Sequence, residues 1–190
     1  MAPLAAKERG PLDINPLGLQ APVAPAPVVV PMATAPENAC AAVGFVIGRA
    51  AERERIVAAD ILMDAIMGAN ESPLKRALLD AGIADDAIGY VADSVAQPFA
   101  VVSLRGARPG AADALRAIVE AEARRLAEGG LDRELVRAAL SHAEFVMRER
   151  NFGYPDGVVL AMSAMAGWLY SDDDPAAYLR FCLLYTSRCV

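Results

Sequence analysis

The sequence predicts an α+β domain in which helices cover one face of a mostly antiparallel sheet. Short apolar segments rich in Val, Ile and Phe predict strands, and longer segments with helical spacing of apolar residues lie between and after them. The predicted order is one strand, two helices, two strands and then three or four helices. Because strands and helices do not alternate regularly, a doubly wound parallel sheet is disfavoured.

The first strand and helix are predicted from "CAAVGFVIGR" and "AAERERIVAADILMDAIMG". The strand begins at Cys40 and ends at Gly48-Arg49, and the helix that follows ends at Gly68. Its predicted buried stripe has helical spacing and comprises Ile56, Ala59, Leu62, Met63 and Ile66.

The second helix has a clear start signal in Ser72 and Pro73. Ser72 is a favourable N-cap residue, and proline is tolerated at the first helical position because that N–H has no partner within the helix. Gly82 is the predicted stop. We expect Lys75 and Arg76 to lie on the exposed face of this helix, opposite a stripe formed by Leu74, Ala77, Leu78 and Ala81.

Two further strands and a run of helices complete the predicted domain. The strands are 89–95 and 99–104, separated by Gln97-Pro98. The next helix begins after Pro109, ends at Gly129-Gly130 and buries one face: Leu115, Ile118, Val119, Glu122 and Leu126. Further helices are predicted from Asp132 to about Arg150, over 158–170, and over 174–181.

The amino-terminal segment 1–37 differs from the rest in composition, because eight of the thirteen prolines lie in it. Proline fixes φ and removes a backbone donor, so this segment is predicted to be an extended linker or arm, with a short edge strand possible. The predicted organisation is therefore an arm over 1–37, an α+β domain over 38–181, and an atypical tail over 182–190.

Composition excludes several classes of partner and site. The net charge of −6 argues against nucleic acid and anionic membranes, which require clustered Lys and Arg. No apolar run approaches the ~20 residues that span a bilayer, and the first residues lack a signal-peptide pattern. An odd number of cysteines, Cys40, Cys182 and Cys189, favours a reduced compartment, so a cytoplasmic location is expected.

The single histidine, His142, lies two residues before Glu144, and this pair raises the question of a zinc site. On a helix the two side chains lie about 200° apart, so they cannot chelate one ion. Helical zinc motifs need ligands three or four residues apart and more than one histidine. We expect Glu144 to pair with Arg148, and we expect His142 at the edge of the core, on a side shared with Leu131, Leu135, Ala138, Phe145 and Val146.

Other acidic clusters have ordinary structural explanations. Asp172-Asp173-Asp174 is predicted to be a solvated helix terminus with Asp174 as the cap, and Asp85-Asp86 is predicted to be a similar feature. The sequence contains no P-loop, G-x-G-x-x-G or G-x-S-x-G motif. We therefore assign no catalytic, cofactor-binding or metal-ligating residue, and predict that this chain alone is inactive.

Several segments, in order, resemble the presequence-protease branch of the pitrilysin/insulinase metallopeptidases. They are "ESPLKRALLDAGIADDAIGY", "AQPFAVVSLRGA" and "HAEFVMRERNFGYPDGVVLAMSAMAGWLYSDDDPAAYLRF", within about residues 40–181. Each motif alone is weak, but their order and spacing are fairly specific.

The resemblance implies a role as well as a fold. The family has four related α+β domains that close around a chamber, with zinc on an inverted H-x-x-E-H helix of the first domain and unfolded peptides as substrates. This stretch resembles the second domain, which carries no zinc ligands and whose implied role is to wall the chamber and support the catalytic domain. The expected partners are therefore the zinc-bearing domain and the other half of the peptidase, in the same chain or a separate one.

Two departures from the family pattern indicate what kind of protein this chain comes from. A proline-rich segment stands where a catalytic domain is expected, and "CLLYTSRCV" leaves the pattern after Phe181. We therefore expect a fragment of a longer peptidase, whose zinc lies in the missing domain. The alternative is an inactive structural or partner-binding subunit of the same superfamily. In either case the isolated chain is expected to expose apolar surface and to self-associate.

Overall fold

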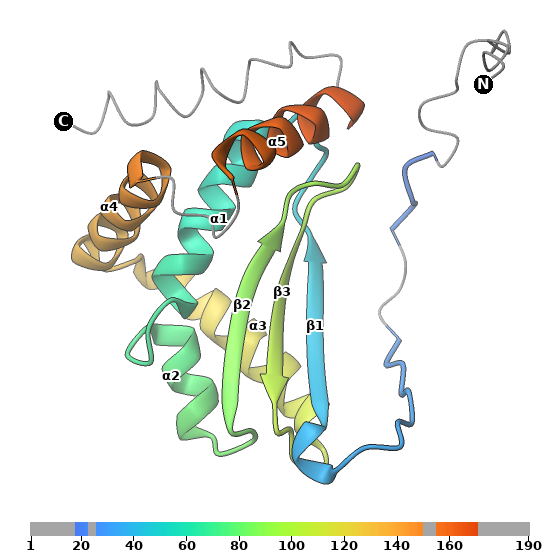
Figure 1. Cartoon of the computed structure of the whole chain (residues 1–190). Coiled ribbons are helices and arrows are strands. Elements are labelled where there is room, and N and C mark those ends of the chain that lie inside the picture. Colours follow the sequence, from blue (N-terminus) through green and yellow to red (C-terminus); the bar gives the residue numbers. More distant parts are fainter. Residues whose placement is uncertain (1–17, 23–25, 150–154, 171–190) are drawn as a thin grey trace, which may run out of the picture.

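A computed structural model describes residues 18–22, 26–149 and 155–170 of the 190-residue chain. Its sheet has three strands in the order β1-β3-β2: β1 (Cys40–Val46), β2 (Asp86–Ala92) and β3 (Phe99–Arg105). Both neighbouring pairs are antiparallel, with Gly44 opposite Val101 and Tyr90 opposite Val101 (Figure 1). The predicted antiparallel sheet is confirmed.

One short 3₁₀ helix and five α-helices accompany the sheet in the described part of the chain. They are η1 (Pro36–Asn38), α1 (Arg53–Met67), α2 (Pro73–Asp80), α3 (Ala111–Gly129), α4 (Arg133–Glu149) and α5 (Asp156–Tyr170). Helices α1, α2 and α3 contact the strands on one face of the sheet, and α4 packs against α1 (Figure 1). The α+β class with helices on one face is therefore confirmed.

The main core lies between the sheet and helices α1, α2 and α3. Alternate residues of β3 and β2 point into it because side chains alternate between the two faces of a strand. Each buried Leu, Val or Met side chain contributes roughly 1.5–3 kcal/mol relative to exposure. The buried members are Met63, Met67, Leu74, Leu78, Ala84, Ala87, Val102, Leu104, Ala111, Leu115 and Val119.

Helix α1 buries two sides, which the single stripe predicted from its sequence did not anticipate. Met63 and Met67 face the sheet, whereas Ile61 and Ala65 form a second small core with Ala139 of α4. Leu62, predicted to be buried, is exposed. An interior helix that packs on two sides loses a clear apolar stripe, so periodicity alone misplaces its faces.

The buried side of α4 also differs from the prediction. Ala139, Leu140 and Ala143 pack toward α1, whereas Ala138 and Phe145 are exposed. The prediction followed the largest apolar side chains, but small residues permit the close approach of two helices. His142 consequently lies beside the α1 contact, with its side chain 62% exposed.

Several local predictions are corrected by the structure. The strand predicted at 89–95 is β2, three residues earlier, because its pairing with β3 begins at Asp86 opposite Arg105. Asp85-Asp86 is therefore a strand start and not a helix terminus. Ser72 is the N-cap of α2, as predicted, but its hydroxyl accepts a hydrogen bond from Ala69 N at 3.1 Å and caps no helical N–H.

Lys75 was predicted to be exposed, and this is wrong. Its side chain is only 14% exposed, and its ammonium lies 3.2 Å from the carboxylate of Asp86 at the start of β2. The neighbouring Arg76 is exposed, as predicted. Lys75 differs because α2 packs against β2, a contact that the helix sequence does not reveal.

The observed starts and ends of the other elements agree closely with the predicted ones. Asp132 caps α4, because Glu134 N donates to its carboxylate at 2.8 Å. Gly68 and Gly130 are the C-cap residues of α1 and α3.

Several predictions lie outside the described residues. They are the helix over 174–181, the cap at Asp174, and Cys182 and Cys189. Over the described ranges, no helix combines the length and apolar content that crossing a bilayer requires.

Candidate functional site

The histidine singled out from the sequence has a partner on another helix. His142 Nδ1 on α4 lies 3.0 Å from Asp64 Oδ2 on α1, although 78 positions separate them in sequence. The contact lies beside the small core formed by Ile61, Ala65 and Ala139. His142 therefore helps to align α4 on α1.

A second carboxylate, Asp60, lies one turn before Asp64 on α1. Asp60 is exposed as a whole residue, but partial desolvation of its carboxyl raises the pKa above its usual value, and the nearby charges of Asp93 and Asp64 raise it further. A raised carboxyl pKa is common at active sites, but structural carboxyl groups show it as well. Asp60 was not predicted as a site residue, although two acids four residues apart in the otherwise apolar segment 56–67 were an available signal.

The residues around His142 do not fit a zinc ion. Three protein ligands are the minimum of ordinary zinc sites. The contact between His142 and Asp64 supplies two groups, and no set of three or more His, Cys, Asp or Glu side chains able to hold a metal occurs in the described parts of the chain. The predicted pairing of Glu144 with Arg148 stays a prediction, because the side chain of Arg148 lies outside the described residues.

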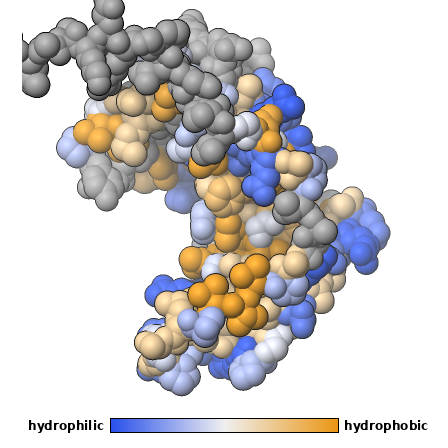
Figure 2. All heavy atoms as spheres, turned by 90° about the vertical axis from the view of Figure 1, so that its right-hand side faces the viewer, coloured by the Kyte–Doolittle hydropathy of each residue, from blue (hydrophilic) through white to orange (hydrophobic). Residues whose placement is uncertain are grey.

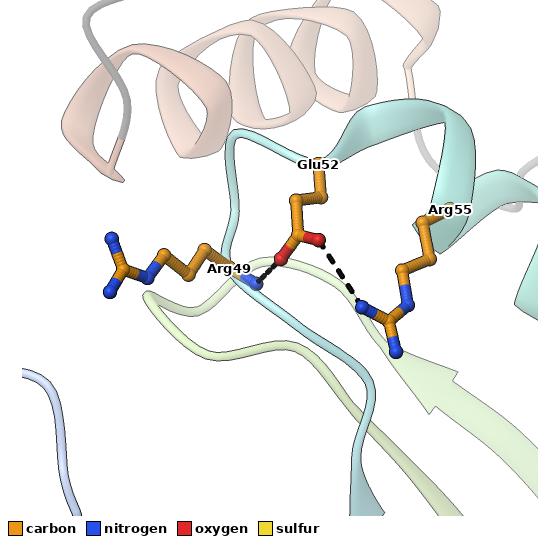
Figure 3. A network of polar contacts seen from close by, with 3 residues as sticks. All are labelled: Arg49, Glu52 and Arg55. Atoms are coloured by element: carbon orange, nitrogen blue, oxygen red, sulfur yellow. Dashed lines mark hydrogen bonds and ion pairs between the residues drawn. The ribbon is translucent and has the colours of Figure 1, made fainter.

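A polar network fixes the turn between β1 and α1 (Figure 3). Arg49 N donates to Glu52 Oε2 at 2.7 Å, and Arg55 Nη1 donates to Glu52 Oε1 at 3.2 Å. The hydrogen bond from the Arg49 backbone lowers the pKa of the Glu52 carboxyl, and Arg55 lowers it further. These three residues therefore stabilise the turn that connects β1 to α1.

The described domain also has an apolar cavity of about 230 Å³ beneath α3. Its lining is almost entirely apolar, so it could accommodate an apolar group but presents no catalytic side chain. Its lining comprises Phe45, Met63, Ile66, Leu74, Val102, Val119, Glu120, Glu122, Ala123 and Leu126.

Helix α5 exposes apolar side chains along its length. Trp168, the single tryptophan of the chain, is 64% exposed. A helix that is apolar on all sides is normally buried by a neighbour. The exposed members are Val158, Met162, Met165, Trp168, Leu169 and Tyr170. This surface is suited to binding another protein surface and not to catalysis.

Several curated proteins match this chain in sequence, and two of them are described here. One is Protein HypA of Clostridium perfringens, 34% identical over 138 residues, which is 72% of this chain and 14% of that protein. The other is the chloroplastic/mitochondrial presequence protease 1 of Arabidopsis thaliana, 29% identical over 118 residues, which is 61% of this chain and 11% of that protein. The chain thus spans a small part of the length of both relatives.

Solved structures share the fold. One is described as the inactive peptidase domain of a candidate zinc protease from Bordetella parapertussis. Its TM-score is 0.61 at 17% identity, and the match covers 78% of this chain and 76% of that one. The second is a candidate zinc protease from Bordetella pertussis Tohama I, with a TM-score of 0.60 at 18% identity over 78% of this chain and 77% of that one.

The chain contains a pitrilysin/insulinase-like domain. The resemblance predicted from the sequence is thereby confirmed as a partial match, and no family model matches the chain. In this pitrilysin/insulinase-like domain the motif "SPLKRALL" forms α2, and "QPFAVVSLRG" forms β3 with its flanking turns.

Proposed function

We propose that this chain is a non-catalytic domain of a zinc metalloendopeptidase that degrades unfolded peptides. Its role is to wall the peptide chamber and to support the zinc-bearing domain. The observation that carries the proposal is the match to presequence protease 1, together with the likeness to a domain described as an inactive peptidase domain.

The surface of the domain supports a role in a larger assembly. The apolar side chains of α5 would be covered by a neighbouring domain, and the polar contacts described above hold elements of the domain together. Zinc belongs, in this proposal, to a separate catalytic domain, where it would activate a water for peptide hydrolysis. The described residues of this chain would supply no ligand to it.

The test is to read and express the longer reading frame around this coding sequence. The proposal expects an H-x-x-E-H motif upstream in the same frame. It also expects that the longer product holds one zinc per chain and cleaves an unfolded peptide, whereas the 190-residue chain holds none. An intact longer frame without the motif, or a 190-residue chain that itself holds stoichiometric zinc and cleaves peptide, would contradict the proposal.

The second candidate is a catalytically inactive subunit that binds a separately encoded peptidase. The likeness to an inactive peptidase domain favours it. Pull-down with the purified chain distinguishes the two, because only the second candidate expects capture of a zinc-bearing peptidase encoded by another gene.

A further inference from the structure

The outer edge of β1 is open in the described structure. In the sheet order β1-β3-β2, β1 has a single neighbour. Ile47 N donates to Pro98 O on the β3 side, so the odd-numbered residues of β1 direct their backbone groups toward β3. The N–H and C=O groups of the even-numbered residues Ala42, Gly44 and Val46 therefore point outward.

This edge lacks the usual protection against strand pairing. Proteins usually prevent pairing at an exposed edge strand with charged side chains, proline or a β-bulge. The seven residues of β1, CAAVGFV, contain no charge and no proline, and they pair with β3 in unbroken register. The backbone groups of this edge can therefore form hydrogen bonds with another extended segment.

The arm that precedes β1 has the sequence needed to fill it. Pro25, Pro27 and Pro31 all occupy odd positions, so proline removes no backbone N–H from the even residues Ala26, Val28, Val30 and Met32, whereas Thr34 N already donates to Met32 O. In an edge strand, proline is tolerated where its missing N–H faces solvent. The backbone groups of the even-numbered arm residues can therefore pair with those of the even-numbered residues of β1.

Contacts on both sides of residues 26–34 hold this part of the chain near the two ends of β1. At one end, residues 35–39 with η1 form a short connection from the arm into β1. At the other end, Gln20 N donates to Gln97 Oε1 at 2.8 Å, and Gln97 Nε2 donates to Gln20 O at 3.1 Å. Gln97 precedes Pro98, the partner of Ile47, so this contact lies at the far end of β1.

In the structure residues 26–34 run alongside β1 without pairing with it (Figure 1). Val28, Val29 and Val30 are between 72% and 87% exposed. Hydrophobic residues also gather in the middle of the face seen from the side of β1 (Figure 2). Three adjacent valines have strong strand propensity, and pairing would remove their apolar surface from water.

We propose that residues 26–34 close onto the open edge of β1 as a fourth, antiparallel strand. The connection 35–39 sets the register, in which Val28 lies opposite Val46, Val30 opposite Gly44, and Met32 opposite Ala42. Val29 then lies opposite Phe45 and covers its exposed ring, which lines the apolar cavity. The closed arm excludes any other extended segment from this edge.

A pair of proline variants tests the proposal by amide hydrogen exchange of the full chain. Val30→Pro places proline on the paired side, whereas Val29→Pro places it on the outward side of the same segment. Exchange at Gly44 N–H and Val46 N–H is expected to be slowed by tenfold or more in the natural chain and in Val29→Pro, and to be fast in Val30→Pro. Fast exchange in the natural chain, or equal loss of protection in both variants, would overturn the proposal.

A disulfide measures the register independently of exchange. With the three native cysteines replaced by serine, Val30→Cys and Gly44→Cys are expected to cross-link, since directly opposite Cα atoms lie about 5.5 Å apart. An added Cβ at Gly44 meets no atom nearer than 3.6 Å, so the site accepts cysteine. The control pair Val29→Cys and Gly44→Cys is expected to cross-link at least tenfold less, because side chains alternate between faces. Equal cross-linking of both pairs, or protection that rises with protein concentration and survives Val30→Pro, would overturn the proposal, the latter in favour of a second copy of the chain.

Discussion

Asp64 of α1 and His142 of α4 lie 3.0 Å apart at the edge of the contact between their helices. The pair joins positions 78 residues apart, yet it is largely exposed on the His142 side. Exposed ion pairs contribute about 0–1 kcal/mol, whereas well-packed apolar contacts contribute more. The small core beside the pair therefore contributes more to holding α4 on α1.

The first prediction compares these two contributions. Asp64→Asn should lower the free energy of unfolding by less than about 1 kcal/mol, because the His142 side chain is largely exposed. Ala139→Leu should lower it by about 1–3 kcal/mol, because the new side chain overpacks the contact with Ile61 and Ala65. Urea unfolding of both variants checks the ranking, and a larger loss for Asp64→Asn would contradict it.

The second prediction concerns pH and Asp60. Because the pKa of Asp60 is raised in the folded chain, its ionisation disfavours folding as pH rises above the usual value of 3.8. Asp60→Asn should therefore increase stability at pH 7, and this gain should fade as pH falls toward 3.8. Urea unfolding across this range provides the measurement. Asp93→Asn should produce a smaller gain in the same direction, and a loss of stability at pH 7 in Asp60→Asn would refute the assignment.

The third prediction contrasts two adjacent cations on α2. Lys75→Ala removes a mostly buried stem and the partner of Asp86, and should cost roughly 1–2 kcal/mol of unfolding free energy. Arg76→Ala removes an exposed pair with Asp80, whose side chain is also exposed, and should cost less than about 0.5 kcal/mol. Both variants lose one positive charge at adjacent positions, so a difference between their thermal or urea unfolding curves reports the effect of burying the Lys75 side chain. Equal costs would show that α2 does not dock through Lys75.

The fourth prediction concerns two strand glycines. An added Cβ at Gly89 would lie 2.5 Å from Met63 Sδ and 3.0 Å from Met67 Cβ, because α1 packs closely on β2. Gly89→Ala should therefore destabilise the fold by about 1–3 kcal/mol. Gly44→Ala is the control, since its added Cβ meets only ordinary contacts. The two unfolding curves should separate clearly, and a neutral Gly89→Ala would mean that α1 can move away from the sheet.

The fifth prediction concerns the exposed apolar surface of α5. The isolated chain should self-associate, and its single tryptophan, Trp168, should be readily quenched by acrylamide at low protein concentration. Light scattering and fluorescence provide the two measurements. Met162→Lys should reduce self-association, whereas Arg137→Ala on α4 should leave it unchanged. A monodisperse natural chain that binds no apolar dye would argue against a covered α5 in a larger assembly.

The sequence by itself determined the fold class, the order of the elements and most of their ends. Glycine and proline supplied this information through local backbone physics, as at Pro73, where α2 begins, and at Gly68 and Gly130, where α1 and α3 end. The order of short motifs also predicted the pitrilysin/insulinase resemblance, which the comparisons confirm.

Only the tertiary structure decided which faces are buried and which polar groups meet. Lys75 meets Asp86, His142 meets Asp64, and Gln97 meets Gln20. Each contact joins residues of segments far apart in the sequence, so neither helical nor strand periodicity encodes it. The burial of both sides of α1 has the same origin, because periodicity describes one element at a time and packing depends on the neighbours that surround it.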